Sequence, residues 1–583
     1  MKPGFDDSLR LAIVALAATL ACQAGLAQTR PAGTPNAGTV LETAPPPPIP
    51  RAGEVAPLDA SRVQPAAQPA AAGPKVKVKS FRLSGNTVFS SEQLAPLLRP
   101  FEGRELSMQE LSDASDVVRD RYRDAGYFLA QAVLPTQDVT EGVVDIRIIE
   151  GTVGQARADV APEARVPASL VNGYLGLLPS GALVTEQSVE RPLLLLSDLP
   201  SVKVHSVLKP GSQFGTADLD LKVTQEGRLF GGSVYADNFG NRNTGETRLG
   251  ADLETRGLLG LGELLTASLF RASNLTTLGR LGVTLPVGPL GTKVSLSYTQ
   301  LSYDVAGAFS NLNADGEGKI VSLLAQHPWT RSRNANLFLL AGVDVKKIED
   351  RTAGTGSGSS SAAPNIDGRH VNLLRLGVNG DFRDDMGGGA LNSYSLSLFQ
   401  GQNKIQTADT LLVDQRSTQT NGSFTKLQFE FLRLQSLASF LSEADSLALA
   451  VKGQLANKNL DPSEKVSLGG PRGVRAFPVG AASGDDSLML SAELRHRLAG
   501  FRPFGANVVL SAFVDYGTVK VLHRGTSADN KLTLGAAGIG LNVVKKDDFQ
   551  IRLELASRLG GNDYTGDEAD TKSRGWLLAQ KWF

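Results

Sequence analysis

After Leu229 the sequence consists of short segments in which apolar and polar side chains alternate. In the segment 392–402, for example, Tyr394, Leu396 and Leu398 alternate with serines. Alternation with period two indicates strands with one apolar face, and about ten residues is the length that a tilted strand needs to cross a bilayer. In the segment 547–557 the polar positions hold Arg552 and Glu554, which fit a wet lumen better than the dry core of a sandwich. The pattern predicts an all-β transmembrane barrel.

We expect about sixteen antiparallel strands in this barrel, an even number as bacterial barrels require. They are placed near residues 229–237, 247–256, 262–271, 278–286, 292–303, 317–326, 335–347, 369–383, 392–402, 422–433, 445–456, 486–497, 505–516, 530–543, 547–557 and 574–583.

The connections between these strands alternate in length. The longer set includes 304–316, 348–368, 403–421, 457–485 and 558–573, and the shorter set includes 287–291, 384–391, 498–504 and 544–546. Long extracellular loops and short periplasmic turns are the expected asymmetry, although the turn 434–444 is longer than this scheme predicts. An even strand count returns the chain to the periplasm, where the N-terminal part must then lie.

The N-terminal 27 residues have the pattern of a secretory signal peptide. Lys2 and Arg10 precede an apolar run over 11–21, which is too short to span a bilayer, and small residues over 25–27 offer a cleavage site. The alternative is a buried N-terminal helix. Residues 28–75 are rich in Pro and Ala and predict a mobile linker. A short helix near 54–63 is interrupted by Pro57, and the residues leave open whether the linker places a plug helix in the barrel.

Two small α+β units follow, over 76–150 and 151–226. In each unit the periodicity predicts the order strand, helix, helix, strand, strand, so the sequence contains a tandem repeat. Ser90 and Ser107 are expected to cap the two helices of the first unit. Small domains with open strand edges bind extended peptides by strand addition, and the alternative is a pair of spacers.

Composition and motifs exclude several classes of function. The 59 basic and 59 acidic residues leave no net charge to attract nucleic acid. The one cysteine, Cys22, lies in the predicted signal peptide, and the five histidines do not stand at metal-ligand spacing. No nucleophile elbow or phosphate-binding loop is found. We therefore predict no enzyme activity, no catalytic residue, no metal site and no cofactor.

The most distinctive local sequence lies in the predicted loop 457–485, where Val474, Arg475, Ala476 and Phe477 follow several glycines. By itself such a segment is usually a solvated surface loop. Two strands later the run 513–517 places a carboxylate in the barrel wall, together with an aromatic residue and a glycine: Phe513, Asp515 and Gly517. A buried carboxylate needs a partner, and a loop arginine folded into the lumen would supply it through two parallel hydrogen bonds. On position alone Arg472 is the rival for this role.

These motifs resemble those of a known superfamily. The sequence Val474-Arg475-Ala476-Phe477 is similar to the Val-Arg-Gly-Phe/Tyr motif of the sixth extracellular loop in Omp85 proteins, with Ala476 at the glycine position. The sequence Phe513-x-Asp515-x-Gly517 resembles the partner motif on their thirteenth strand. The N-terminal units resemble POTRA domains. Two such domains before a sixteen-stranded barrel look like the two-partner secretion transporters, the TpsB proteins of haemolysin-activator or filamentous-haemagglutinin secretion type. The aromatic end, Trp582 and Phe583, resembles the assembly signal of outer-membrane proteins, although Lys581 departs from that pattern.

The resemblance implies an outer-membrane transporter with its POTRA domains in the periplasm. It would recognise a large, partly unfolded β-helical exoprotein of the TpsA type and pass it to the cell surface without nucleotide hydrolysis. Further expected partners are outer-membrane lipid, lipopolysaccharide and the barrel-assembly machinery. The alternatives are an Omp85-type insertase, which usually has more POTRA domains, and a passive porin, which would not need periplasmic domains.

Overall fold

A computed structural model describes residues 36–43, 75–200, 202–273, 275–353, 365–524, 530–559 and 571–583. The predicted signal peptide and the helix near 54–63 lie outside these residues. Among the described helices, none is long and apolar enough to cross a membrane.

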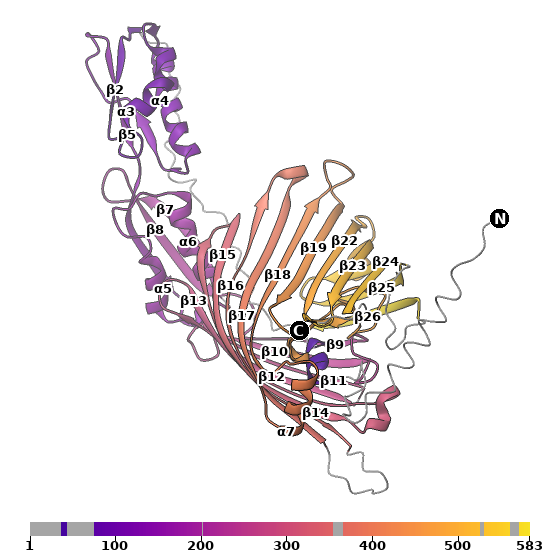
Figure 1. The fold of residues 1–583 in the computed structure, drawn as a ribbon. Coiled ribbons are helices and arrows are strands. Elements are labelled where there is room, and N and C mark those ends of the chain that lie inside the picture. The colour runs from indigo at the N-terminus through magenta and orange to yellow at the C-terminus, as the bar shows by residue number, and fades with distance from the viewer. Residues whose placement is uncertain are drawn as a thin grey trace, which may run out of the picture.

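Sixteen antiparallel strands close into one barrel, which confirms the predicted fold and strand count. Each strand pairs with its neighbour in the chain, and β26 pairs with β9 to close the cylinder (Figure 1). The strands are β9 (Phe230–Asp237), β10 (Arg248–Arg256), β11 (Leu264–Ala272), β12 (Thr276–Val287), β13 (Thr292–Asp304), β14 (Asp315–Arg331), β15 (Ala335–Thr352), β16 (Asn365–Asp384), β17 (Ala390–Ile405), β18 (Gly422–Ser436), β19 (Asp445–Ala456), β22 (Asp486–Arg497), β23 (Asn507–Lys520), β24 (Lys531–Lys545), β25 (Phe549–Arg558) and β26 (Ser573–Trp582).

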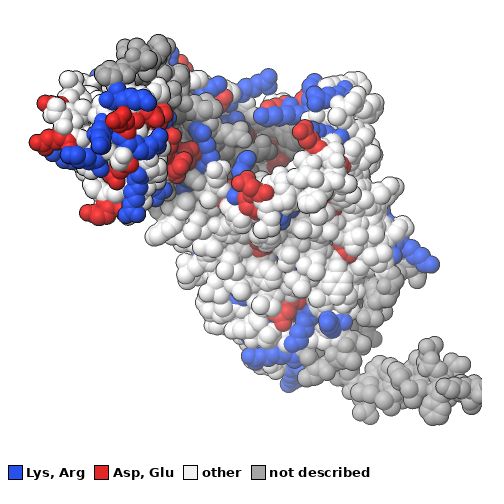
Figure 2. All heavy atoms as spheres, turned by 90° about the horizontal axis from the view of Figure 1, so that it is seen from above, with Lys and Arg blue, Asp and Glu red and all other residues white. Residues whose placement is uncertain are grey.

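The alternating pattern of each strand separates a lipid face from a lumen face. On β17, Leu396 and Leu398 are among the exposed apolar side chains, whereas Ser397 between them is buried inside. On the face drawn in Figure 2, the middle of the barrel wall accordingly carries few charged side chains. The predicted assignment of apolar residues to the outside is thus confirmed by the burial of individual positions.

The barrel closes at a short seam between its last and first strands. Only five residue pairs join β26 to β9, from Leu578–Asp237 to Trp582–Ser233. Phe583 extends the seam, because its N–H donates to the Gly232 carbonyl at 3.1 Å. Lys581, which departs from the expected apolar pattern, forms an ion pair with Asp548 in the turn before β25.

The first POTRA-like domain has the predicted order of elements, with two additional short strands that pair with each other. It contains β1 (Val76–Lys77), β2 (Ser80–Ser84), α3 (Ser91–Leu98), β3 (Glu105–Leu106), α4 (Met108–Asp124), β4 (Gln131–Val133) and β5 (Val143–Ile149). Ser90 and Ser107 both form capping boxes, as predicted. The main sheet has the order β2-β5-β4, and α3 and α4 bury Leu94, Val118 and Tyr122 in the core with Ile146.

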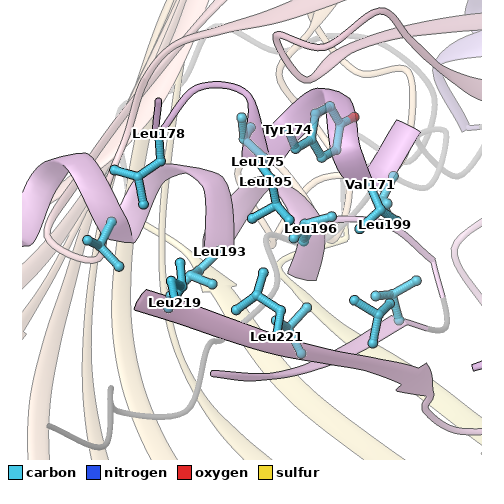
Figure 3. Close-up of a cluster of buried hydrophobic side chains, with 14 of the residues drawn as sticks. Val171, Tyr174, Leu175, Leu178, Leu193, Leu195, Leu196, Leu199, Leu219 and Leu221 are labelled. Atoms are coloured by element: carbon cyan, nitrogen blue, oxygen red, sulfur yellow. The ribbon is translucent and has the colours of Figure 1, made fainter. Parts of the chain in front are cut away.

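The second POTRA-like domain repeats this arrangement. It contains β6 (Thr152–Val160), α5 (Ala168–Leu175), α6 (Glu186–Ser197), β7 (Val202–Pro210) and β8 (Thr216–Gln225), with the sheet order β6-β8-β7. Leucines of α6 pack against Leu219 and Leu221 of β8 (Figure 3). Both domains extend from one end of the barrel, and helix α7 (Ala408–Arg416), in the connection 403–421, lies at the opposite end (Figure 1).

Candidate functional site: a loop anchored inside the barrel

The connection between β19 and β22 folds back into the lumen. It contains the short helix η5 (Pro462–Glu464) and the paired strands β20 (Val466–Ser467) and β21 (Ser483–Gly484). Val474, Ala476 and Phe477 are fully buried in a cluster with residues of the barrel wall, including Phe513 and Leu534. The surface-loop alternative is therefore wrong for this segment.

Arg475 and Asp515 form a bidentate ion pair at the tip of this loop. Arg475 donates from Nε to Asp515 Oδ2 at 2.8 Å and from Nη2 to Oδ1 at 2.9 Å. The Arg475 backbone N–H also donates to Oδ2, at 3.2 Å. Both side chains are almost completely buried, at 5% and 1% exposed. Such a pair fixes position and orientation together, because a planar guanidinium matches a carboxylate at two points.

Two further carboxylates contact the same guanidinium. Arg475 Nη1 donates to Glu493 on β22 at 2.7 Å and to Glu554 on β25 at 2.8 Å. Arg495 and Arg552 contact Glu493 and Glu554 respectively, at 2.9 and 2.6 Å. The loop arginine is thus one member of a buried network that joins three barrel strands.

The aromatic and glycine positions of the motifs complete the anchor. The Arg475 guanidinium carbon lies 3.2 Å from the centroid of the Phe513 ring, so cation–π attraction adds to the ion pair. A Cβ atom at Gly517 would lie 3.1 Å from side-chain atoms of Leu468 and Val474. Only a glycine leaves the loop room to pack on this part of the wall without displacing its neighbours.

The structure therefore brings the two predicted motifs together and selects Arg475 over Arg472 as the partner of Asp515. Sequence reasoning missed Glu493 and the role of Trp576, whose indole N–H donates to the Arg475 carbonyl at 2.7 Å. In the sequence, Glu493 is visible only as a charged residue at a lumen-facing position of the predicted strand 486–497. Many other lumen-facing positions are charged too, so this feature does not single out Glu493 as a partner of Arg475.

A second set of ion pairs anchors the start of the loop. Glu464 contacts Lys346 on β15 at 2.6 Å and Lys426 on β18 at 2.8 Å. Asp461 contacts Arg369 on β16 at 2.8 Å. The loop is consequently tied to both halves of the barrel wall.

A helix from the N-terminal linker also lies in the lumen. Helix α2 (Ala37–Thr43) packs Ala37 and Val40 among wall residues such as Phe270 and Leu301. The N–H of Ala37 donates to Asp350 Oδ1 at 3.2 Å. The sequence left open whether the linker over 28–75 places a helix in the barrel, and seven of its residues do form one here. The barrel supplies the apolar contacts and the helix cap that the isolated segment lacks.

This architecture is that of a known protein family. The profile described as "Haemolysin secretion/activation protein ShlB/FhaC/HecB" matches residues 215–543, which is more than half of the chain. The chain belongs to this family. A ShlB-type POTRA domain profile matches residues 76–151. The transporter is therefore a TpsB protein of the Omp85 superfamily, located in the outer membrane with periplasmic POTRA domains, and it serves two-partner secretion.

Curated relatives and solved structures agree with this assignment. The "Heme/hemopexin transporter protein HuxB" of Haemophilus influenzae is 27% identical over 506 residues, 85% of the transporter and 84% of the relative. The "Outer membrane transporter CdiB" of Dickeya dadantii is 23% identical over 476 residues, 80% of each chain.

The fold is shared with CdiB from Escherichia coli, at a TM-score of 0.69 and 22% identity over 91% of the transporter and 94% of that chain. BamA from Haemophilus ducreyi lacking POTRA domains 1–3 has a TM-score of 0.50 at 15% identity, over 87% and 100%. The curated relatives HuxB and CdiB are both described as transporters, so the insertase alternative is not favoured.

Proposed function

We propose that this transporter exports one large exoprotein of β-helical type, that it does so without catalysing a reaction, and that it receives its client as an extended chain. The observation that carries the proposal is a polar barrel lumen joined to the second of two tandem periplasmic domains, whose sheets have open edges. Lipid and lipopolysaccharide surround the apolar wall, and the barrel-assembly machinery would recognise the aromatic end, Trp582 and Phe583.

The second POTRA domain offers a suitable edge for an extended client. Strand β7 lies at one end of the sheet order β6-β8-β7 and has a strand neighbour only on its β8 side among the described residues. Its outer side can therefore pair with a client backbone, while client side chains point alternately to the two faces. Backbone pairing suits a partner recognised while it is unfolded.

The loop anchor has a structural role in this proposal. The network around Arg475 holds the 457–485 loop inside the lumen, where it contacts strands that a passing client must also approach. Arg475, Asp515 and their neighbours are thus positioning residues, and none of them is assigned a catalytic role.

Deletion of the gene in its own host tests the proposed export. We expect one large protein to disappear from the culture medium and to return on complementation, while the other outer-membrane barrels keep their normal levels. A general loss of barrels would instead indicate the insertase. If the deletion strain released the same set of proteins into the medium as the parent strain, the proposed export would be refuted.

Binding by the POTRA domains can be tested separately. Each domain has its own hydrophobic core, so residues 76–225 are a reasonable soluble fragment. We expect modest affinity for the N-terminal part of the client, because ordering an unfolded chain costs entropy. Absence of binding at high micromolar concentration would leave the two domains as spacers.

A further inference from the structure

The second POTRA domain is joined to the barrel at two successive periplasmic turns and at the periplasmic end of the next strand, β14. The Gly262 N–H donates to the Arg165 carbonyl at 3.2 Å in the turn after β10. Gly291, in the turn after β12, leaves room for Leu195, because a Cβ atom there would lie 2.4 Å from that side chain. Near the periplasmic end of β14, Arg191 donates to the carbonyls of Pro328 and Trp329 at 2.8 and 3.0 Å.

One buried ion pair stands at the centre of this junction. Arg331, the last residue of β14, donates from Nε to Asp198 Oδ2 at 2.8 Å and from Nη2 to Oδ1 at 2.7 Å. The two side chains are 3% and 7% exposed. Asp198 caps the C-terminal end of α6, so this pair connects a POTRA helix directly to a barrel strand.

The pair belongs to a chain of hydrogen bonds that joins four successive barrel strands, β13 to β16. Lys293 of β13 donates to the Asp198 carbonyl at 2.8 Å. Arg331 donates from Nη1 to Asn336 of β15 at 3.0 Å, and Asn336 donates to Asp381 of β16 at 3.0 Å. Two cations at the C-terminal end of α6 also oppose the negative end of its helix dipole. Loss of either partner would leave a charge buried without its counterion, which is strongly disfavoured.

The pair also lies beside the periplasmic mouth of the lumen. A cavity of about 410 Å³ is bounded by Asp198 of the POTRA domain, by Lys293 of β13 and by residues of β16 to β18, among them Arg375, Asp381 and Glu430. The carboxylate that fixes α6 is thus part of the wall of this cavity. Any tilt of the second POTRA domain would change the shape of the mouth.

We propose that Asp198 and Arg331 are a positioning pair, which holds the second POTRA domain over the periplasmic mouth so that an extended client passes from this domain into the lumen. The claim that a client passes from this domain into the lumen rests on the proposed function. The claim that the pair holds the domain in place does not. The pair Arg333–Glu190, at 2.9 Å, bridges the same junction and provides the matched control. Its arginine is 40% and its glutamate 12% exposed, so water reaches this pair, and an ion pair in contact with water contributes less than a buried one.

Pulsed electron paramagnetic resonance on the full-length protein in lipid nanodiscs tests the positioning. Spin labels at Phe214→Cys in the second POTRA domain and Phe440→Cys in a periplasmic turn, both exposed positions, report the distance across the junction. The background is Cys22→Ser. We expect a narrow distribution in the parent and in Arg333→Ala, and a broad one in Asp198→Asn and Arg331→Gln. An equally narrow distribution in Asp198→Asn, or equal broadening by Arg333→Ala, overturns the proposal.

Heat-modifiable migration on gels shows whether each variant still has a folded barrel. If Asp198→Asn does not fold, Asp198→Glu and Arg331→Lys keep the charges but change the two-point geometry, and an intermediate width is then expected. Widths equal to the parent in both conservative variants would overturn the bidentate contact as the positioning element.

Secretion is measured in the same variants. We expect loss of secretion to accompany the broadened distribution, with Arg333→Ala secreting normally. Broadening without loss of secretion overturns the role in transport. If the parent secretes no exoprotein, the proposed function fails, and the resonance result still decides the positioning claim.

Discussion

Gly38 of the lumen helix lies so close to Pro462 of the anchored loop that a Cβ atom at residue 38 would be 2.4 Å from the Pro462 carbonyl carbon. The contact joins the linker helix to the same loop that carries Arg475. Helix and loop therefore fit together as one packed insert inside the barrel.

Replacement of Gly38 by alanine should displace helix α2 from the lumen. The added methyl group would overlap backbone atoms of Pro462 and Ser463, which cannot move as a flexible side chain would. We expect higher single-channel conductance in planar bilayers. Gly279→Ala is the control, because a Cβ atom there meets nothing within 4 Å. Equal conductance of Gly38→Ala and the parent would contradict this packing.

Removal of either member of the Arg475–Asp515 pair should abolish most secretion while the barrel still assembles. Breaking a buried pair costs about 3–5 kcal/mol. Loss of Arg475 leaves the Asp515 carboxylate without its counterion, whereas loss of Asp515 leaves Arg475 with Glu493 and Glu554 but without its two-point anchor. The double mutant should be little worse than either single one, and Arg475→Lys should restore only part of the activity. The measurement is the amount of secreted exoprotein, divided by the amount of assembled transporter in the outer membrane. Arg472→Ala, which removes the neighbouring loop arginine, provides the comparison. Additive losses, or normal secretion by Arg475→Ala, would remove the pair from the mechanism.

Gly517 should tolerate alanine poorly and valine not at all. A methyl group there meets Leu468 and Val474 at 3.1 Å, so the loop must shift by a few tenths of an ångström, and a branched side chain requires more. We expect graded loss of secretion in the order glycine, alanine, valine. The control is Gly535→Ala on β24, where the nearest side-chain atom would be 3.5 Å away. Equal secretion by Gly517→Val and the parent would show that the loop does not need this packing.

The first POTRA domain should lose stability in acid through Glu150. Burial alone would raise the pKa of Glu150, but hydrogen bonds from Thr87, Val88 and Tyr122 outweigh it and hold the pKa below its ordinary value. The stabilisation is therefore complete above the unfolded pKa of this carboxyl and is lost as the pH falls through the lower folded pKa. Hydrogen exchange of the α4 amides measures it.

Two variants serve as comparisons for this acid response. Glu150→Gln should flatten the pH dependence, because the amide does not titrate over this range. Glu150→Ala should destabilise the domain by about 1–3 kcal/mol at neutral pH, since buried donors lose their acceptor. An unchanged acid response in Glu150→Gln would assign the effect to another group.

Protease added to intact cells should cut the connection 403–421 and spare residues 76–225. Arg416, at the end of α7, is exposed at the barrel end opposite to the POTRA domains (Figure 1). Trypsin cleavage after Arg416, detected by mass spectrometry, checks the orientation, and Arg416→Gln should remove that cut. Cleavage of the POTRA region in intact cells would contradict it.

The sequence by itself determined the barrel, its sixteen strands and which side chains of each strand face lipid. The reason is that successive side chains of a strand point to opposite faces, so apolar residues toward lipid alternate with polar residues toward the lumen. It also determined the capped helices of the first POTRA domain, since Ser90 and Ser107 each accept a hydrogen bond from a backbone N–H only three residues later in the sequence. Only the tertiary structure decided that Glu493 and Glu554 share Arg475, that α2 lies in the lumen, and that Asp198 meets Arg331. The two ion-pair contacts of Arg475 and the pair Asp198–Arg331 join residues that are 18 to 133 positions apart in the sequence. Ala37 of helix α2 and its partner Asp350 are 313 positions apart. Local periodicity carries no information about such partners, because burial and charge pairing arise only when the closed barrel brings distant segments together.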